Sequence, residues 1–206
     1  MTRIIGGEFR GRRLRVPGEG TRPTSDRVRE AVFNIVDARM DLDDARVLDL
    51  YAGSGAVGLE ALSRGASSAV LVDASRRAAS VIAANLATCG AAARAAVVTR
   101  SVGAYLSGSP VNSFDLVFLD PPYDLDNAQM TSDLAALADG WLAADSMVIV
   151  ERATRAAPTE WPAGLAVVVS KDYGDTRVEM ARPKIDTEQI DTEEIDTEEI
   201  DANRIV

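Results

Sequence analysis

The residues best suited to chemistry are four in a row, Asp120-Pro121-Pro122-Tyr123. Because proline has no backbone N–H, this stretch offers carbonyl oxygens and one carboxylate as hydrogen-bond acceptors, with no donor between them. Such acceptors suit the two hydrogens of a substrate NH2 group, and Tyr123 adds a flat face on which a nucleobase can stack. The same four residues also fit a rigid turn with a half-buried tyrosine, and taken alone they leave both interpretations open.

A glycine-rich turn is the second feature that points to a ligand. Gly53, Gly55 and Gly58 follow an expected strand and open an expected helix that runs through Arg64, and Asp73 lies twenty residues after Gly53. In dinucleotide-binding proteins, glycines at this spacing let the backbone approach the ligand, and the later acid binds ribose hydroxyls. The spacing therefore predicts a cofactor site, although a packing turn that binds nothing remains an alternative.

Asp49 favours a cationic cofactor over NAD. It lies two residues before the turn, where its negative charge would repel a pyrophosphate and attract a cation. S-adenosylmethionine carries a sulfonium, an ammonium, a carboxylate and a ribose. We expect Asp49 to face the cationic methionine end, the helix N-terminus after Gly55 to take the carboxylate, and Asp73 to bind the ribose.

The elements that must position these residues alternate between strand and helix. The strands are expected at 47–51, 69–72, 95–99, 114–119, 147–150, 165–169 and 177–181, and the helices from Thr24 to about Arg39, after Gly55 to Arg64, at 76–88 and at 131–137. Thr24 is the expected N-cap of the first helix. This alternation predicts an α/β fold with a parallel sheet and helices on both faces, which places Asp120 at a strand's carboxyl end, where ligands bind.

The N-terminal segment is basic although the chain carries a net charge of −10. Residues 1–29 hold eight arginines against three acids. Residues 3–17 predict two short strands around a glycine turn, with Arg10 and Arg12 on one face and Arg13 and Arg15 on the other. This basic ribbon is a plausible footprint for nucleic acid, and a merely solvated arm is the alternative.

Composition excludes several classes of protein. The chain of 206 residues contains no histidine and one cysteine, Cys89, which excludes Ser-His-Asp catalysis, a disulfide framework and a cysteine zinc site. Neither a long apolar run nor a leader sequence is evident, so we expect one cytoplasmic domain with no membrane segment and no metal.

Several separated motifs together resemble one family. They are Asp49-Leu50-Tyr51-Ala52-Gly53-Ser54-Gly55, Asp120-Pro121-Pro122-Tyr123, Arg3-Ile4-Ile5-Gly6-Gly7, Arg22-Pro23-Thr24-Ser25-Asp26-Arg27-Val28-Arg29-Glu30, Leu59-Glu60-Ala61-Leu62-Ser63-Arg64-Gly65 and Tyr173-Gly174-Asp175. The first two resemble class I methyltransferases that act on amino groups. The full set, which covers nearly everything from Met1 to about Pro183, is similar to the RsmD family of bacterial 16S rRNA guanine-N2 methyltransferases.

The resemblance implies a fold, a reaction and a set of site residues. The fold is Rossmann-like, with seven mostly parallel strands and a small N-terminal β-hairpin extension. The reaction is methylation by S-adenosylmethionine of one guanine N2 in 16S rRNA, within the 30S subunit or a late assembly particle. The implied catalytic residues are Asp120, Pro121 and Tyr123. The implied cofactor-binding residues are Thr24, Asp49, Tyr51, Gly53, Ser54, Gly55, Asp73, Ala74, Ser101 and Val102. The implied RNA-binding residues are Arg3, Arg10, Arg12, Arg13, Arg15, Arg22 and Arg27.

The sequence departs from the family pattern in three places. Tyr51 stands where phenylalanine is usual, and Ser101 stands where relatives tend to carry Asn or Asp near the cofactor adenine. The third departure is the C-terminal segment, in which isoleucines recur every five residues between acidic ones. An acidic low-complexity segment is expected to be disordered. We therefore divide the chain into an extension at 1–20, a catalytic domain at 21–183 and an acidic tail at 184–206.

Two other functions remain open at this point. An amino methyltransferase that acts on adenine in DNA, or on a protein amide, would use the same acceptors, although no DNA-recognition domain is evident. A non-catalytic RNA-binding assembly factor would keep the basic ribbon, but it would not need Asp49, Asp120 and Tyr123 together.

Overall fold

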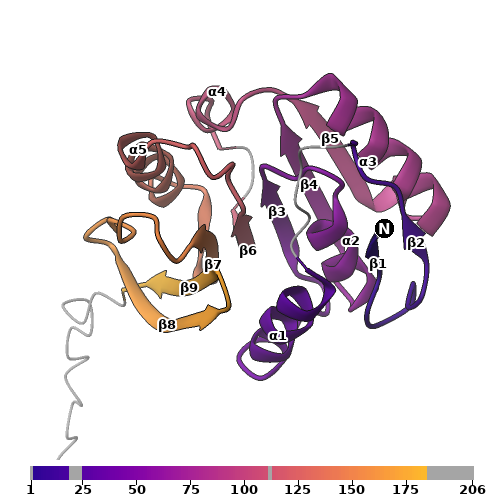
Figure 1. Cartoon of the computed structure of the whole chain (residues 1–206), viewed down its shortest axis with the longest axis horizontal. Helices are drawn as coiled ribbons and strands as arrows, with labels where there is room; N and C mark the ends of the chain where they lie inside the picture. The colour runs from indigo at the N-terminus through magenta and orange to yellow at the C-terminus, as the bar shows by residue number, and fades with distance from the viewer. Residues whose placement is uncertain (1, 19–24, 111–112, 185–206) are drawn as a thin grey trace, which may run out of the picture.

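The structure, a computed structural model, describes residues 2–18, 25–110 and 113–184. Its centre is a seven-stranded sheet with the strand order β5-β4-β3-β6-β7-β9-β8 (Figure 1). The strands are β3 (Arg46–Leu50), β4 (Ser68–Asp73), β5 (Ala95–Thr99), β6 (Phe114–Leu119), β7 (Leu142–Ala153), β8 (Leu165–Tyr173) and β9 (Thr176–Pro183).

The first five of these strands in the chain are parallel, and β9 is antiparallel to both β7 and β8. The chain runs outward from β3 through β4 to β5 and then returns to β6 on the other side of β3. Strand order therefore reverses between β3 and β6, and in open α/β sheets the crevice at such a reversal is where ligands bind.

Helices cover both faces of the sheet. One face packs against α1 (Asp26–Asp37), α2 (Ala56–Ser63), α3 (Arg76–Cys89) and the N-terminal hairpin. The other packs against α4 (Val102–Leu106) and α5 (Asn127–Ala138). The predicted fold class is therefore confirmed. Among the described residues, no helix has the length and apolar character needed to cross a membrane.

Several predicted boundaries are wrong for identifiable reasons. The N-cap of α1 is Ser25, whose hydroxyl accepts a hydrogen bond from the Val28 N–H, and the helix ends at Asp37. The expected cap, Thr24, lies outside the described residues, as do Arg22 and the tail from residue 185. Helix α5 begins four residues early because Asp126 caps it. Helix α4 was missed because five residues are too few to show helical periodicity.

The N-terminal extension is a hairpin of β1 (Thr2–Arg3) and β2 (Arg13–Leu14), packed tightly on α2. The backbone N–H groups of Ile5 and Gly6 each donate to the buried carboxylate of Glu60 at 2.8 Å. The Phe9 N–H donates to the Ser63 hydroxyl at 2.8 Å, and this hydroxyl donates to the Gly6 carbonyl at 2.6 Å. These bonds satisfy turn groups of the hairpin that strand pairing leaves open.

A buried arginine joins the hairpin to α1. Arg29 is 1% exposed, and its guanidinium donates to the Thr2 hydroxyl, the Arg3 carbonyl and the Asp26 carboxylate. Hydrogen bonds to a charged group are stronger than neutral ones, so this residue holds both segments in place. The hairpin thus belongs to the main core, to which it contributes Ile4, Phe9 and Leu14.

The predicted two-faced arginine ribbon is wrong in detail. Arg10 and Arg12 lie in the turn and the segment after it, so strand alternation does not assign their faces. All the same, the described arginines assigned to RNA are exposed: Arg3, Arg10, Arg12, Arg13, Arg15 and Arg27. Arg12 also has a structural role, because it donates to the Thr88 carbonyl at 3.0 Å and lies 5.2 Å from the centre of the Phe9 ring.

Because the hairpin packs closely against α2, we expect a side chain at Gly7 to destabilise the protein. The φ of Gly7 is +71°, and a Cβ there would lie 1.7 Å from the Ser63 carbonyl oxygen. Gly11 has a φ of +82°, but a Cβ there would meet nothing within 4 Å. Gly11→Ala should cost roughly 1–2 kcal/mol of backbone strain, and Gly7→Ala should cost about 1–3 kcal/mol more because the neighbours must move. Urea unfolding of both variants checks this, and equal midpoints would contradict the packing described.

Candidate functional site

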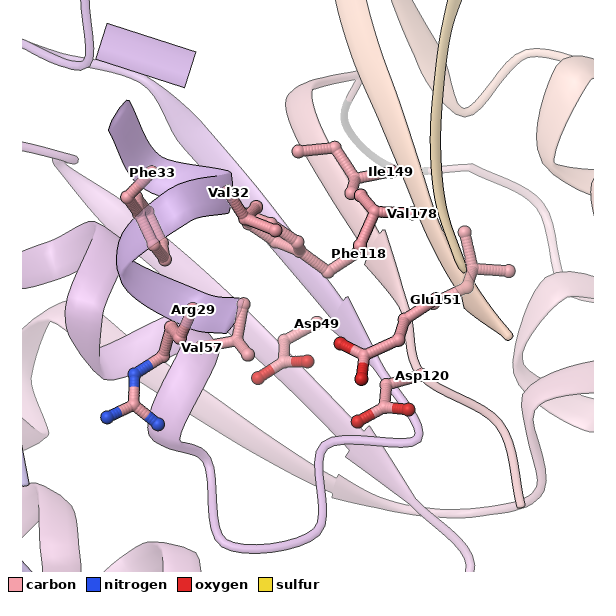
Figure 2. Close-up of a pocket in the computed structure, with 11 residues that line it drawn as sticks. Arg29, Val32, Phe33, Asp49, Val57, Phe118, Asp120, Ile149, Glu151 and Val178 are labelled. Atoms are coloured by element: carbon pink, nitrogen blue, oxygen red, sulfur yellow. The ribbon is translucent and has the colours of Figure 1, made fainter. Parts of the chain in front are cut away.

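Two carboxylates lie side by side where β6 and β7 approach their carboxyl ends. Leu119 of β6 is paired with Val150 of β7, and the next residues are Asp120 and Glu151. Because successive side chains alternate between the two faces of a sheet, Asp120 and Glu151 share a face and lie on neighbouring strands. Figure 2 shows the two carboxylates next to each other.

Asp49 of β3 completes a group of three acids. It is paired with Phe118 of β6, two residues before Asp120, so alternation puts Asp49 and Asp120 on the same face. That face is the one covered by α1 and α2. The three acids line one cavity together with Arg29 and the apolar side chains of Val32, Phe33, Val57, Phe118, Leu119, Ile149 and Val178 (Figure 2).

Burial changes the charge of Asp49. Its side chain is 3% exposed, and one oxygen accepts a hydrogen bond from the Gly58 N–H at 3.0 Å. Desolvation raises the pKa of Asp49 to about 8, and the charges of Asp120 and Asp73 add to the rise although the Gly58 bond opposes it. At neutral pH this carboxyl is therefore mostly protonated.

The glycine turn has the geometry of a backbone-lined ligand site. Gly55 is the N-cap of α2 in the left-handed region with φ of +73°, and a Cβ there would press on Leu71 and Ile82. A Cβ on Gly58 would lie 3.2 Å from the Asp49 carboxylate. These two glycines let α2 begin directly against the sheet, so that the first N–H groups of the helix point toward the crevice.

Asp73 holds the glycine turn from the end of β4. One carboxylate oxygen accepts from the Gly53 N–H at 2.8 Å, and the other accepts from the Ser75 N–H at 2.8 Å. Each oxygen keeps a second lone pair for a further donor such as a ribose hydroxyl. Ala74, which follows Asp73, is exposed.

The side chain of Tyr51 points away from the three acids. Its φ is +61°, its ring packs with the core on the α4 and α5 face, and its hydroxyl donates to the buried Asp133 of α5 at 2.5 Å. Gln129 donates to the other Asp133 oxygen at 2.9 Å. Burial and the Asp133 carboxylate both raise the pKa of the Tyr51 hydroxyl. Only the backbone of Tyr51 therefore takes part in the glycine turn. Its side chain is directed to the other face of the sheet, where the hydroxyl holds the turn against α5.

The remaining cofactor candidates lie around the same turn. Ser101 is the N-cap of α4, and its hydroxyl accepts from the Ala104 N–H at 3.3 Å. Val102 is buried in the core beneath it. The Ser54 carbonyl accepts from the Asn85 side-chain amide at 2.9 Å. Ser101 is thus at the carboxyl end of β5, two strands from β3, where the far end of an extended cofactor would lie.

The residues of the Asp120–Tyr123 turn differ in their exposure to solvent. Pro121 is buried, whereas Tyr123 is 55% exposed. The guanidinium of Arg155 lies 5.6 Å from the centre of the Tyr123 ring. An exposed ring beside a cation is open to a flat ligand from solvent, and the arrangement can stack a base near the acceptors of the turn.

Sequence reasoning missed three residues of this region. Glu151 directly follows the apolar run 147–150, and an acid at a strand's carboxyl end was a readable signal. Arg155 lies in a turn and carries no sequence signal. Asn85 is buried in α3, where its side chain accepts from the Arg15 N–H at 2.8 Å and donates to the Arg15 carbonyl at 2.9 Å, and only the packing shows this.

The arrangement can bind a cation beside Asp49 and hold an amine beside Asp120, on adjacent strands. Within the described ranges no three His, Cys, Asp or Glu side chains form a group that could hold a metal ion.

Comparison with known proteins gives consistent matches. The family model of conserved hypothetical protein 95 matches residues 2–182. Ribosomal RNA small subunit methyltransferase D of Escherichia coli K12 is 44% identical over 152 residues, which is 72% of this chain and 73% of that protein. The same-named protein of Haemophilus influenzae is 36% identical over 152 residues, 72% of this chain and 77% of that one. The solved structure of yhhF from Escherichia coli aligns with a TM-score of 0.77 at 37% identity, over 89% of this chain and 98% of that chain.

Burial of Asp49 predicts how stability depends on pH. An aspartate ionises near pH 3.8 when unfolded, so between about pH 4 and 8 the folded state holds a proton that the unfolded state has lost. Stability of the wild type must therefore fall as pH rises through this interval. Asp49→Asn removes this loss, so it should raise the free energy of unfolding by an amount that is near zero at pH 4 and on the order of 5 kcal/mol at pH 8.

Urea unfolding at several pH values measures this difference. Asp145→Asn is the matched control, because Asp145 is exposed and its substitution should give no gain that grows with pH. A gain for Asp49→Asn that stays constant between pH 4 and 8 would contradict the raised pKa.

Proposed function

This chain belongs to the RsmD family, and from that premise we propose that it transfers a methyl group from S-adenosylmethionine to the N2 amino group of one guanine in 16S rRNA. The observation that carries the proposal is the placement of Asp49 and Asp120 at the carboxyl ends of two adjacent strands. A cation held by the first and an amine held by the second would then lie next to each other.

The cofactor would bind along the carboxyl ends of β3, β4 and β5. Its ammonium and sulfonium would lie near Asp49, its carboxylate near the first N–H groups of α2, and its ribose at Asp73. The adenine would lie toward Ser101 and Val102, with Ala74 beside it. Bound S-adenosylmethionine supplies an electrophilic methyl group, and the protein supplies position and electrostatics.

Asp49 would ionise as the cofactor binds. A positive charge within a few ångströms favours the charged form of a carboxyl, which opposes the desolvation that raises its pKa to about 8. The site would thus be nearly neutral at Asp49 when empty and would form an ion pair when occupied. Such a site discriminates against neutral and anionic nucleosides, which cannot offset the cost of ionising a buried acid.

The guanine amine needs activation because its lone pair is delocalised into the ring. The Asp120 carboxylate and the Pro121 carbonyl would each accept one N2 hydrogen and hold the amine so that its lone pair points at the methyl carbon. Methyl transfer to this nitrogen would form the N–C bond as the C–S bond of the bound cofactor breaks, with the bonding pair going to the sulfur. The proton lost from nitrogen passes to Asp120 and then to water. Positioning of this kind is worth up to ~7–11 kcal/mol of the barrier.

Tyr123 and Arg155 would bind the target nucleotide on the solvent-exposed side of the site. A guanine must leave its stack to reach the acceptors, at a cost of a few kcal/mol, and stacking on the exposed Tyr123 ring would return about 1–3 kcal/mol. The Arg155 guanidinium beside that ring would meet the phosphate of the same nucleotide.

The exposed arginines of the hairpin would hold the RNA backbone without reading its sequence. Arg3, Arg10, Arg13, Arg15 and Arg27 are exposed on or next to the hairpin. The substrate would be rRNA in the 30S subunit or in a late assembly particle. We therefore expect the enzyme to act in the cytoplasm.

A labelling experiment tests the proposed reaction. Small subunits from a strain lacking the enzyme are incubated with S-adenosylmethionine carrying a labelled methyl group, and the modified nucleotide is mapped. The wild type should label the N2 atom of one 16S guanine. Asp120→Ala should bind the cofactor within a few-fold in calorimetry but should abolish transfer, because the amine loses its acceptor. Label on adenine, on protein or on nothing would refute the proposal, and full activity of Asp120→Ala would refute the role of Asp120.

The hairpin arginines should act through counterion release. Arg10→Glu with Arg13→Glu should weaken binding to the small subunit and reduce the slope of log affinity against log salt by about 1–2, because two phosphate contacts are lost. Arg12 is left intact because it also packs on Phe9. Lys171→Glu with Lys184→Glu is the control, since it makes the same charge change at exposed residues of the β8 and β9 end. Equal losses for both pairs would show that net charge alone is responsible.

A further inference from the structure

We infer that Glu151 is a specificity-determining residue that accepts a hydrogen bond from the N1–H group of the target guanine. This inference rests on the proposed function and deepens it, because it concerns how the same site selects guanine over other purines. It starts from a residue to which the amine chemistry above gives no role.

The position of Glu151 is set by the sheet. Glu151 follows Val150 of β7, which is paired with Leu119 of β6, so Glu151 lies beside Asp120 on a strand about 4.8 Å away. Both carboxylates line the cavity that also contains Asp49, and Figure 2 shows the Glu151 carboxylate beside that of Asp120. The β9 residue opposite Glu151 is Val178, an apolar wall of the same cavity.

The Watson–Crick edge of guanine matches two neighbouring acceptors. On that edge the N1–H donor lies next to the N2 amino group, which has two further hydrogens. If Asp120 and the Pro121 carbonyl hold the amino group, the next donor along the edge is N1–H, and the next acceptor along the sheet is Glu151. A charge-assisted hydrogen bond there would fix the rotation of the base about the amine and keep N2 in line with the methyl group.

The same contact would exclude purines that lack this donor. Adenine and 2-aminopurine both carry a bare ring nitrogen at N1, which is an acceptor. Opposite the Glu151 carboxylate, this nitrogen would leave two acceptors facing each other with no hydrogen between them. A site that is built to accept a hydrogen bond discriminates strongly against a substrate that lacks the donor. 2-Aminopurine is the sharper probe, because it keeps the reactive N2 amino group and changes N1 together with position 6.

Glutamine at position 151 offers a test by rescue. Glu151→Gln has almost the same shape, and its amide can turn either its oxygen toward an N1–H donor or its NH2 toward a bare N1 acceptor. The variant should therefore accept both guanine and 2-aminopurine. A residue with a purely structural or charge-balancing role would alter the rates for both bases by the same factor.

The experiment compares small subunits that carry guanine or a single 2-aminopurine at the mapped nucleotide, with the wild type, Glu151→Gln and Glu30→Gln. Glu30 is exposed on α1 and serves as the matched control. For the wild type and the control, kcat/KM should be roughly 100-fold or more lower on 2-aminopurine than on guanine. For Glu151→Gln the ratio should fall to within about tenfold, through loss on guanine and gain on 2-aminopurine. Calorimetry with S-adenosylmethionine checks that each variant is folded.

Each outcome decides one question. An unchanged ratio in Glu151→Gln, or a wild type that methylates both bases equally, overturns the role of Glu151 and leaves the proposed reaction standing. Failure of the wild type to methylate guanine at N2 overturns the proposed reaction and this inference with it. A collapsed ratio in Glu151→Gln alone supports the inference.

Discussion

Strand register at the centre of the sheet is the constraint on which this site depends. The pairing of β3 with β6 and of β6 with β7 brings Asp49, Asp120 and Glu151 to one face, near the end of each strand. If one of these strands shifted by one residue against its neighbour, its acidic side chain would move to the other face of the sheet. The apolar residues of β3, β6 and β7 pack into the cores on both faces of the sheet and make such a shift unfavourable, so the hydrophobic core fixes the geometry of the polar site.

Acids gathered on a buried face are unfavourable for folding, and the structure limits this cost locally. Asp49 keeps one hydrogen bond from Gly58 and holds its proton up to about pH 8. Glu60, buried on the same side of the sheet, is instead surrounded by donors from the hairpin and from Arg64, and lies 3.7 Å from Arg29. The first acid has room for an incoming partner, whereas the second is already fully engaged. This contrast supports the proposal that Asp49 binds a ligand, whereas Glu60 has a structural role.

Sequence patterns predicted the parts of the molecule that depend on short-range periodicity. The strands 95–99 and 114–119 have the expected bounds, and the glycine turn opens a helix as expected, although α2 begins at Ala56, inside the predicted turn 52–58. β-branched runs and glycines signal these features locally. The start of β7 was missed because the residues after Leu142 are alanines and polar residues, which are recruited into the sheet by their neighbours. The proximity of Glu151 to Asp120, the bond from Tyr51 to Asp133 and the burial of Arg29 depend on contacts between distant segments, which no local pattern contains.

The amide of Asn85 gives the N-terminal hairpin a second significance. One buried side chain is bonded to both backbone groups of Arg15 and to the carbonyl of Ser54 in the glycine turn. The arginine-bearing arm is therefore not a detachable module. A chain trimmed past Arg15 would leave the Asn85 amide in the interior with part of its hydrogen bonding unsatisfied, and the turn would lose one of its fixed neighbours. Shortening the chain from its N-terminus would first remove the core residues of the hairpin and, once Arg15 is lost, a hydrogen-bonding partner that the glycine turn shares through Asn85.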